Sequence, residues 1–202
     1  MIAIIDYNAG NIKSVEKAFD YIGKKAICTR DYHDILKADG IVLPGVGSFE
    51  YAMGELKRYE LDKAIVEVVD RQVPFLGVCL GLQLLFEESE ENVGCRGLSV
   101  LKGKIHRIPG SDEYKVPHIG WNSIKLSNNG RLFEGIDDNS FVYFVHSYYL
   151  KAEDEDIVTA SCEYSVNIHA SVEKDNIFAC QFHPEKSSTI GLKILKNFAE
   201  IV

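Results

Sequence analysis

One cysteine stands in a pattern that is typical of an enzymatic nucleophile. Cys79 lies between Gly77 and Gly81, so the segment reads Gly-Val-Cys-Leu-Gly. The apolar run at residues 73–78 is typical of a buried parallel strand, and apolar residues recur at helical spacing from Leu82 onward. Cys79 is therefore predicted at a strand-to-helix turn, where flanking glycines let a strained residue project from a sheet.

Such a turn would favour thiolate chemistry at Cys79. Free N–H groups at the start of a helix stabilise a thiolate, which is the nucleophilic form of cysteine. The backbone N–H of Leu80 would point toward an oxyanion formed on the attacked group. A cysteine in an apolar segment is more often a small buried hydrophobic residue. The two glycines and the change from strand to helix favour the nucleophile here.

A general base with an orienting carboxylate is predicted near the C-terminus. The apolar segment at residues 177–182 leads into His183-Pro184-Glu185. Residues two apart in a strand project to one side, so His183 and Glu185 are expected to face together, with Pro184 ending the strand pairing. A carboxylate beside an imidazole fixes its tautomer and stabilises its protonated form. This spacing predicts a Cys-His-Glu triad.

A glycine-rich turn, Pro44-Gly45-Val46-Gly47, follows a short apolar run at residues 41–43. Open α/β sheets place ligand-binding backbone at the carboxyl ends of parallel strands. We expect the N–H of Val46 or Gly47 to be a second oxyanion donor, with a plain turn as the alternative. Neither a lysine nor a GxGxxG spacing follows, so a phosphate-binding loop is not predicted.

The elements around these residues predict an α/β protein with a mostly parallel central sheet, flanking helices and an antiparallel β extension. In the first half, predicted strands at 2–5, 26–29, 41–43 and 73–78 alternate with helices at 12–22 and 61–71 and a short helix or loop at 31–37. Asn11 is expected to cap the first helix, after a turn at 8–11. The second half contains short β-rich segments at 121–126, 141–145, 157–162 and 170–172, before a C-terminal helix.

Composition favours one soluble domain over residues 1–202. A net charge of -8 with no cluster of lysine and arginine argues against a nucleic-acid partner. Five cysteines without a CxxC pair argue against a disulfide framework or a structural zinc site, and favour a reducing cytoplasm. The N-terminus is acidic too soon for a signal peptide, and no apolar run approaches the roughly 20 residues of a membrane span. We expect neither a metal nor a cofactor.

Together these motifs resemble the class I, or triad, glutamine amidotransferases. The segments at 44–47, 77–83 and 182–185 carry that resemblance. Others are similar to the glutaminase subunits of imidazole glycerol phosphate synthases within that family: Asp-Tyr-Asn-Ala-Gly-Asn at 6–11, Pro-His-Ile-Gly-Trp-Asn at 117–122, Tyr-Phe-Val-His-Ser-Tyr at 143–148 and His-Pro-Glu-Lys-Ser at 183–187. The resemblance covers essentially the whole chain.

The resemblance implies the role of each site residue. Cys79 would attack the side-chain amide of glutamine, and His183 would act as base and then as acid to the departing ammonia. Glu185 would orient His183, while the backbone at Val46 or Gly47 and at Leu80 would hold the oxyanion. The residues implied to hold the amino-acid end of glutamine are Gln83, Glu91, Ser147 and Tyr148. An anionic Glu91 suits a substrate ammonium.

The resemblance also implies a partner. Ammonia would pass to a separate cyclase subunit, a (β/α)8 barrel bound as a heterodimer, in a step of histidine biosynthesis. Nothing in the sequence resembles a site for a phosphorylated ribotide, so the ammonia acceptor is expected on another polypeptide. We expect the segments around Asn11, Trp121 and Lys186 to form the interface rim. The alternative places Trp121 in the core and leaves Lys186 as a solvated surface charge.

Other functions remain open on the sequence alone. The glutaminase of pyridoxal phosphate synthase is one, although such proteins usually carry Gly-Gly-Glu-Ser where this chain has Pro-Gly-Val-Gly. A non-catalytic regulatory subunit is a second, against which the complete set of Cys79, His183 and Glu185 weighs. A cysteine hydrolase with another substrate is a third, supported by fold analogy alone.

Overall fold

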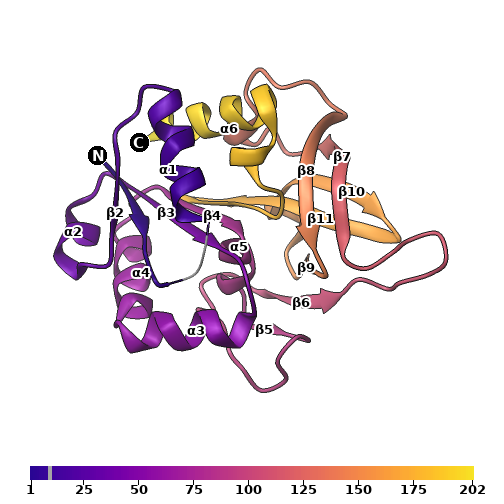
Figure 1. Cartoon of the computed structure of the whole chain (residues 1–202), viewed down its shortest axis with the longest axis horizontal. Coiled ribbons are helices and arrows are strands. Elements are labelled where there is room, and N and C mark those ends of the chain that lie inside the picture. Colours follow the sequence, from indigo (N-terminus) through magenta and orange to yellow (C-terminus); the bar gives the residue numbers. More distant parts are fainter. Residues whose placement is uncertain (9–10) are drawn as a thin grey trace.

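The computed structural model describes residues 1–8 and 11–202, so the predicted turn at 8–11 lies partly outside the described residues. Within these residues the chain builds a nine-stranded sheet in the order β2-β1-β3-β4-β12-β11-β10-β7-β8 (Figure 1). The strands are β1 (Ile2–Ile5), β2 (Ala26–Thr29), β3 (Gly40–Gly45), β4 (Phe75–Cys79), β7 (His118–Leu126), β8 (Ser140–His146), β10 (Val158–Tyr164), β11 (Val166–Lys174) and β12 (Ile177–Cys180).

The sheet has a parallel half and an antiparallel half. The neighbours from β2 to β12 pair in parallel. From β12 through β11, β10 and β7 to β8 every pairing is antiparallel. This arrangement confirms the predicted α/β class with an antiparallel extension. The parallel register sets Gly45 of β3 beside Cys79 of β4, which brings the two candidate catalytic turns together.

Helices cover both faces of the parallel half because its strands are apolar on both sides. Ala3 and Ile5 pack into one core, and Ile2 and Ile4 into the other, as the period of two in a strand requires. In Figure 1, α1 and α6 lie above the sheet, with α2, α3 and α4 below it. The helices are α1 (Ile12–Tyr21), α2 (Tyr32–Lys37), α3 (Phe49–Arg58), α4 (Leu61–Asp70) and α6 (Ser188–Ile201).

Helix α3 and a second, small sheet are absent from the sequence-based prediction. Helix α3 begins after Ser48, whose hydroxyl accepts a hydrogen bond from the N–H of Tyr51. The second sheet has the order β5-β6-β9, with β5 (Glu88–Ser89), β6 (Gly103–Arg107) and β9 (Tyr148–Ala152). Only Ser147 separates β8 from β9, so the chain passes from one sheet to the other at a residue implied to bind substrate.

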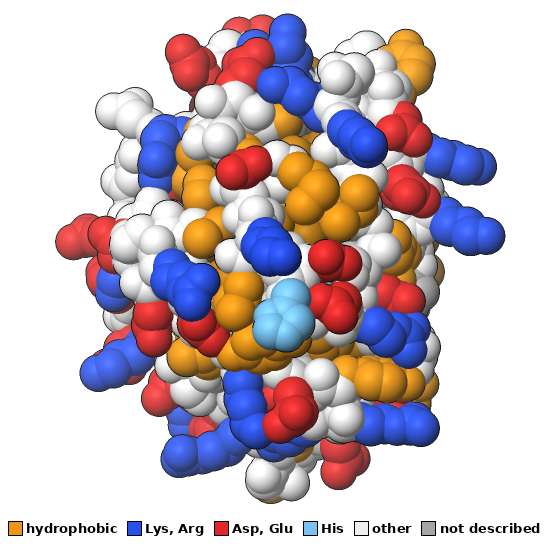
Figure 2. Space-filling view, turned by 90° about the vertical axis from the view of Figure 1, so that its left-hand side faces the viewer, with side chains coloured by type: hydrophobic (Ala, Val, Ile, Leu, Met, Phe, Trp, Pro, Cys, Tyr) orange, Lys and Arg blue, Asp and Glu red, His pale blue; other side chains and the backbone are white. Residues whose placement is uncertain are grey.

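The surface at the β2 end of the molecule is charged. Figure 2 faces the end that carries α2 and the edge strand β2, and shows acidic and basic side chains interspersed over it, with small hydrophobic areas between them. Charges of both signs on a sheet edge oppose pairing with another chain. Among the described residues, no helix is both long enough and apolar enough to cross a membrane.

Candidate active site

The predicted turn at Cys79 is present and strained. Cys79 has φ 55° and ψ -109°, a combination that residues other than glycine rarely adopt. It ends β4 and immediately precedes α5 (Leu80–Leu84). A Cβ on Gly81 would lie 1.9 Å from the carbonyl oxygen of Leu43, and one on Gly77 would lie 2.8 Å from that of Gly81. Close backbone packing therefore requires both glycines.

His183 and Glu185 face each other, but not from a strand as predicted. Strand β12 ends at Cys180, and a 3₁₀ turn at Pro184–Lys186 follows His183. Proline suits the first position of a helical turn because its φ is fixed and its missing N–H would have no partner there. The turn brings Glu185 Oε1 to 2.8 Å from His183 Nδ1.

Hydrogen bonds anchor this turn to strand β8. The N–H of His183 donates to the carbonyl of Tyr143 at 2.9 Å. Ser187 Oγ donates to the carbonyl of His183 at 2.6 Å and accepts from the N–H of Tyr143 at 2.9 Å. The antiparallel half thus fixes the position of the imidazole relative to Cys79.

The electrostatics favour a protonated His183. Burial lowers the pKa of His183, but interactions with the Cys79 and Glu185 side chains outweigh that effect and raise it to about 10. The histidine and glutamate side chains are 1% and 0% exposed. His183 Nε2 and Glu185 Oε2 are buried without a hydrogen-bond partner within residues 1–8 and 11–202. The raised pKa favours the imidazolium form of the ring, which is a potential acid.

Asn11 does not cap α1 with its side chain, which corrects the prediction. It occupies the N-cap position with φ 75° and makes no side-chain capping bond. Its amide Nδ2 instead donates to Glu185 Oε1, the oxygen that faces His183. A carboxylate is a stronger acceptor for this amide than a backbone group. The Asn11 backbone is left-handed, and its side chain points to Glu185 instead of the first turn of α1. Asn11 therefore lies behind the candidate triad.

The sequence-predicted oxyanion turn lies beside Cys79. The hydroxyl of Tyr7 donates to the carbonyl of Pro44 at 2.9 Å and so holds the end of β3. Gly47 has φ +99°, and no heavy atom lies within 4 Å of the place that a Cβ would occupy. The turn is therefore not packed against other parts of the described structure at Gly47.

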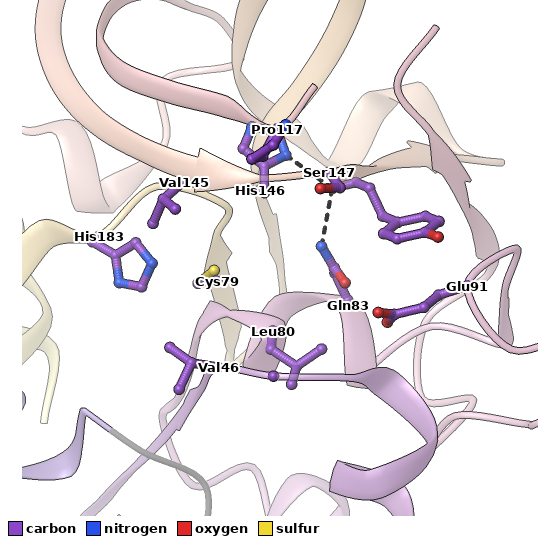
Figure 3. Close-up of a pocket in the computed structure, with 12 residues that line it drawn as sticks. Val46, Cys79, Leu80, Gln83, Glu91, Pro117, Val145, His146, Ser147 and His183 are labelled. Carbon is purple, nitrogen blue, oxygen red and sulfur yellow. Dashed lines mark hydrogen bonds between the residues drawn. The ribbon is translucent and has the colours of Figure 1, made fainter. Parts of the chain in front are cut away.

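A pocket of about 330 Å³ joins these parts. Figure 3 shows Val46, Cys79 and His183 toward one end, and Gln83 and Glu91 toward the other. The structure thus brings together the residues predicted to form the nucleophile, the oxyanion site and the substrate site, with Glu185 directly behind His183. The lining consists of Val46, Gly47, Cys79, Leu80, Gln83, Glu91, Pro117, Val145, His146, Ser147, Tyr148 and His183.

Hydrogen bonds occupy the amide nitrogen of Gln83, and no described residue donates to its oxygen. Both N–H bonds of its amide are used, one to the carbonyl of Tyr148 at 3.0 Å and one to Gln181 Oε1 at 2.9 Å. Glu91 Oε2 accepts from the N–H of Phe49 at 2.9 Å, at the start of α3. Gln83 Oε1 and the Glu91 carboxylate are acceptors, so this end of the pocket suits a ligand that donates hydrogen bonds.

Gln181 is a site residue that the sequence analysis missed. Its side chain is fully buried, and its Nε2 donates to Cys79 Sγ at 3.7 Å while its Oε1 accepts from Gln83. The signal in the sequence is a lone amide inside the apolar segment at 177–182. A buried amide needs polar partners, and here one of those partners is the candidate nucleophile.

Trp121 and Lys186 do not line the pocket. Lys186 is exposed, and Trp121 is 52% exposed, so the alternative that placed Trp121 in the core is wrong.

Within the described part of the chain, no group of three or more histidine, cysteine, aspartate and glutamate side chains is arranged to hold a metal ion.

Comparisons with known proteins identify the family of this chain. The family model for class-I glutamine amidotransferases matches residues 3–202. The imidazole glycerol phosphate synthase subunit HisH of Methanocaldococcus jannaschii is 50% identical over 202 residues, which cover 100% of both chains. The protein of the same name from Bacillus mycoides is 50% identical, covering 100% of this chain and 95% of the relative.

Solved structures show the same fold at lower identity. One described as a glutamine amidotransferase superposes with a TM-score of 0.78 at 17% identity, covering 100% of this chain and 98% of the other. A glutamine amidotransferase from Thermotoga maritima gives 0.66 at 18% identity, covering 99% and 80%. The family-model match over residues 3–202, with the relatives 50% identical over the full chain, shows that the chain belongs to the class I glutamine amidotransferase family.

Proposed function

We propose that this chain is the glutaminase subunit of an imidazole glycerol phosphate synthase, which hydrolyses glutamine to glutamate and ammonia and supplies the ammonia to histidine biosynthesis. The observation that carries the proposal is the strained Cys79 turn facing a buried His183–Glu185 pair across one pocket. The full-length identity of 50% to synthase subunits of that name supports the specific reaction.

In the proposed reaction, Cys79 Sγ attacks the side-chain amide carbon of glutamine. The backbone N–H groups of Leu80 and of Val46 or Gly47 hold the oxyanion of the tetrahedral intermediate. His183, which has taken the thiol proton, gives a proton to the departing ammonia, so that a glutamyl thioester remains. Water then attacks the thioester and releases glutamate and the thiol. The raised pKa of His183 suits the step in which it acts as an acid.

The far end of the pocket would hold the amino-acid end of glutamine. The Glu91 carboxylate and Gln83 Oε1 are acceptors for the α-ammonium group, since both amide hydrogens of Gln83 are already used. The backbone at Ser147 and Tyr148 would face the α-carboxylate, because both residues line the pocket and the Tyr148 carbonyl accepts a hydrogen bond from Gln83.

We also propose a partner: a cyclase subunit with a (β/α)8 barrel, bound as a heterodimer. The support is an exposed apolar face on β7 and β8, where Ile119, Trp121 and Phe141 are 60%, 52% and 58% exposed. Trp121 pairs with Tyr143, and Ile119 with Val145, which lines the pocket. This face therefore extends to the mouth of the site. Exposed apolar surface with an aromatic anchor is typical of an interface.

Asn11 and Lys186 complete the proposed rim. Lys186 is exposed and directly follows Glu185, and Asn11 donates to the Glu185 carboxylate. A partner that contacts Asn11 would therefore be one hydrogen bond away from the triad residue Glu185.

The proposed place of action is the cytoplasm. All five cysteines are free thiols, which fits a reducing compartment.

The test is the release of glutamate by the unaltered chain and by Cys79→Ala, each with the partner subunit. The variant should release no glutamate above background while it stays folded and still binds the partner. The complex should still make product when ammonia is supplied. Glutamate release by Cys79→Ala would refute the proposed nucleophile, and failure of supplied ammonia to support synthesis would refute the separation of roles.

A further inference from the structure

Two buried histidines connect strand β7 to the pocket through hydrogen bonds. His118 and His146 are paired residues of β7 and β8 and are 3% and 6% exposed. His118 Nδ1 lies 3.0 Å from His146 Nε2, and His146 Nδ1 lies 2.8 Å from the carbonyl oxygen of Tyr148. The proposed mechanism uses neither ring.

The neighbours of the two rings determine where the protons are. The carbonyl of Tyr148 only accepts, so His146 Nδ1 must carry a hydrogen. At the other end, Asn122 Oδ1 accepts from the N–H of Ser123 at 2.8 Å, which fixes the orientation of the amide. Asn122 Nδ2 then donates to the carbonyl of Glu163 at 3.1 Å and faces His118 Nε2 at 3.5 Å.

Only a neutral pair satisfies all of these contacts. From Asn122 through His118 and His146 to the carbonyl of Tyr148 there are three contacts. When both imidazoles are neutral and carry hydrogens on Nδ1, each contact has one donor and one acceptor, with Asn122 Nδ2 as the first donor and the Tyr148 carbonyl as the last acceptor. An additional proton on either ring would leave a donor facing a donor. Each hydrogen bond from Asn122 through the two rings is therefore donated toward the Tyr148 carbonyl.

The surroundings favour this neutral state. Burial lowers the pKa of His118 to about 4 and that of His146 to about 3. His118 and His183 also act electrostatically on His146, and both disfavour a positive charge on it. The ring of His118 is stacked between the rings of Tyr164 and Phe144, with centroids 3.9 and 4.8 Å away.

A series of hydrogen bonds continues from the Tyr148 carbonyl to Cys79. The carbonyl that accepts from His146 also accepts from Gln83 Nε2 at 3.0 Å (dashed lines in Figure 3). The second hydrogen of that amide goes to Gln181 Oε1, and Gln181 Nε2 reaches Cys79 Sγ. The Tyr148 carbonyl and Gln181 Oε1 together therefore determine which way the Gln83 amide faces.

We propose that His118 and His146 are positioning residues of the substrate pocket. As a neutral pair with fixed tautomers, they hold the Tyr148 carbonyl in place, and that carbonyl orients Gln83 so that its oxygen faces the α-ammonium of glutamine. The inference rests on the proposed glutaminase function and deepens it, because it assigns the substrate end of the pocket to residues that do not contact the reacting atoms.

The first test reads the tautomers directly in the unaltered protein. Long-range ¹H–¹⁵N spectra of histidine-labelled protein distinguish a protonated ring nitrogen from a bare one. Both rings should show Nδ1–H and a bare Nε2 from about pH 8 to about pH 5, above the pKa of either ring. A hydrogen on Nε2 of either neutral ring, or titration of either ring near the ordinary value, would overturn the proposal whatever the enzyme does.

The second test asks whether the pair acts on substrate binding. His118→Phe keeps a ring between Tyr164 and Phe144 and removes both nitrogens. For a diazo-ketone analogue of glutamine, the half-saturating concentration for Cys79 labelling should rise about tenfold, with the limiting rate changed less than about twofold. Iodoacetamide has no amino-acid end and should label both proteins equally. His118→Asn keeps a donor near the Nδ1 position and should restore much of the loss.

Controls separate this proposal from the proposed function. His169 is also buried, and its Nδ1 accepts from the N–H of Ala152 at 3.1 Å, so His169→Phe removes a buried histidine that does not line the pocket. It should leave the half-saturating concentration unchanged. An unchanged value in folded His118→Phe would overturn the positioning role. If the unaltered chain is not labelled saturably, the glutaminase proposal fails, and the tautomer measurement still decides the state of the pair.

Discussion

The two halves of the large sheet differ in how many of their faces are buried. In the parallel half, β1, β3, β4 and β12 are buried along their whole length, because helices cover both faces. In the antiparallel half, β7 and β8 bury one face and expose the other, where Ile119, Trp121 and Phe141 lie. The charged β2 end in Figure 2 differs sharply from this apolar face.

The two halves also contribute differently to the candidate active site. Dense backbone packing around Gly77 and Gly81 holds Cys79 in a strained conformation, which a covered sheet can support. The antiparallel half supplies the anchor of His183 at Tyr143, and it ends at the Ser147 turn. The parallel half is expected to determine the chemistry, whereas the antiparallel half is expected to determine what the site binds.

The largest expected effect comes from the oxyanion turn of the parallel half. Val46→Pro removes the proposed N–H donor and should lower kcat for glutamine hydrolysis by about two to three orders of magnitude, the typical cost of one such donor. Val46→Ala keeps the N–H and should be far milder. Steady-state kinetics of both variants make the comparison, and equal losses would mean that the side chain matters instead of the backbone.

The backbone packing beneath Cys79 should determine stability. In Gly81→Ala the new Cβ would meet the carbonyl oxygen of Leu43 at 1.9 Å, so we expect a loss of about 3 kcal/mol in the free energy of unfolding. Gly54→Ala is the matched control in α3, where no atom lies within 4 Å of the new Cβ; it should stabilise by about 0.5–1 kcal/mol. Urea unfolding measures both, and a stable Gly81→Ala would contradict the close packing.

Trp121→Ala tests the exposed face of the antiparallel half. Loss of a central aromatic anchor should weaken partner binding by about 2 kcal/mol, or about thirtyfold in Kd, while the melting temperature of the chain alone stays the same. Tyr21→Ala removes an aromatic residue that is 79% exposed on the helical half and should leave binding unchanged. Binding titrations decide, and equal effects of the two substitutions would remove the basis for this interface.

A further effect should appear in the pH dependence of stability. The pKa of His183 in the folded protein is about 10, above its ordinary value of 6.5. The protonated ring therefore contributes stability that is fully present below pH 6.5 and is lost as the pH rises through about 10. Cys79→Ala removes one of the two interactions that raise this pKa, so its stability should fall less over that range. Equal pH profiles in urea unfolding would contradict the interaction.

Local patterns explain which features are predictable from the sequence. The Cys79 turn is predictable because its apolar strand, two glycines and helical spacing occupy one continuous segment. The pairing of His183 with Glu185 is predictable from their spacing, but the strand geometry is wrong because Pro184 starts a helical turn. Asn11 fits a capping position by residue type, yet its partner, Glu185, lies 174 residues further along the chain.

Other features depend on contacts that no local pattern records. Strand β5 has two residues, which is too short to show a period, and β9 pairs with β6 only because the chain turns at Ser147. Gln181 directly follows β12, and its side chain contacts Cys79 of β4 and Gln83 of α5. Helix α3 is the exception, since Ser48 followed by apolar residues at helical spacing is a readable start signal.

The most direct test of the central claim is the site of labelling by a chloro-ketone analogue of glutamine, located by peptide mass spectrometry. We predict one adduct, on Cys79, whose formation glutamine suppresses competitively. The other four cysteines, Cys28, Cys95, Cys162 and Cys180, serve as internal controls, because burial raises the pKa of each of these thiols. Labelling of another cysteine in place of Cys79, or labelling of Cys79 that glutamine does not slow, would contradict the account.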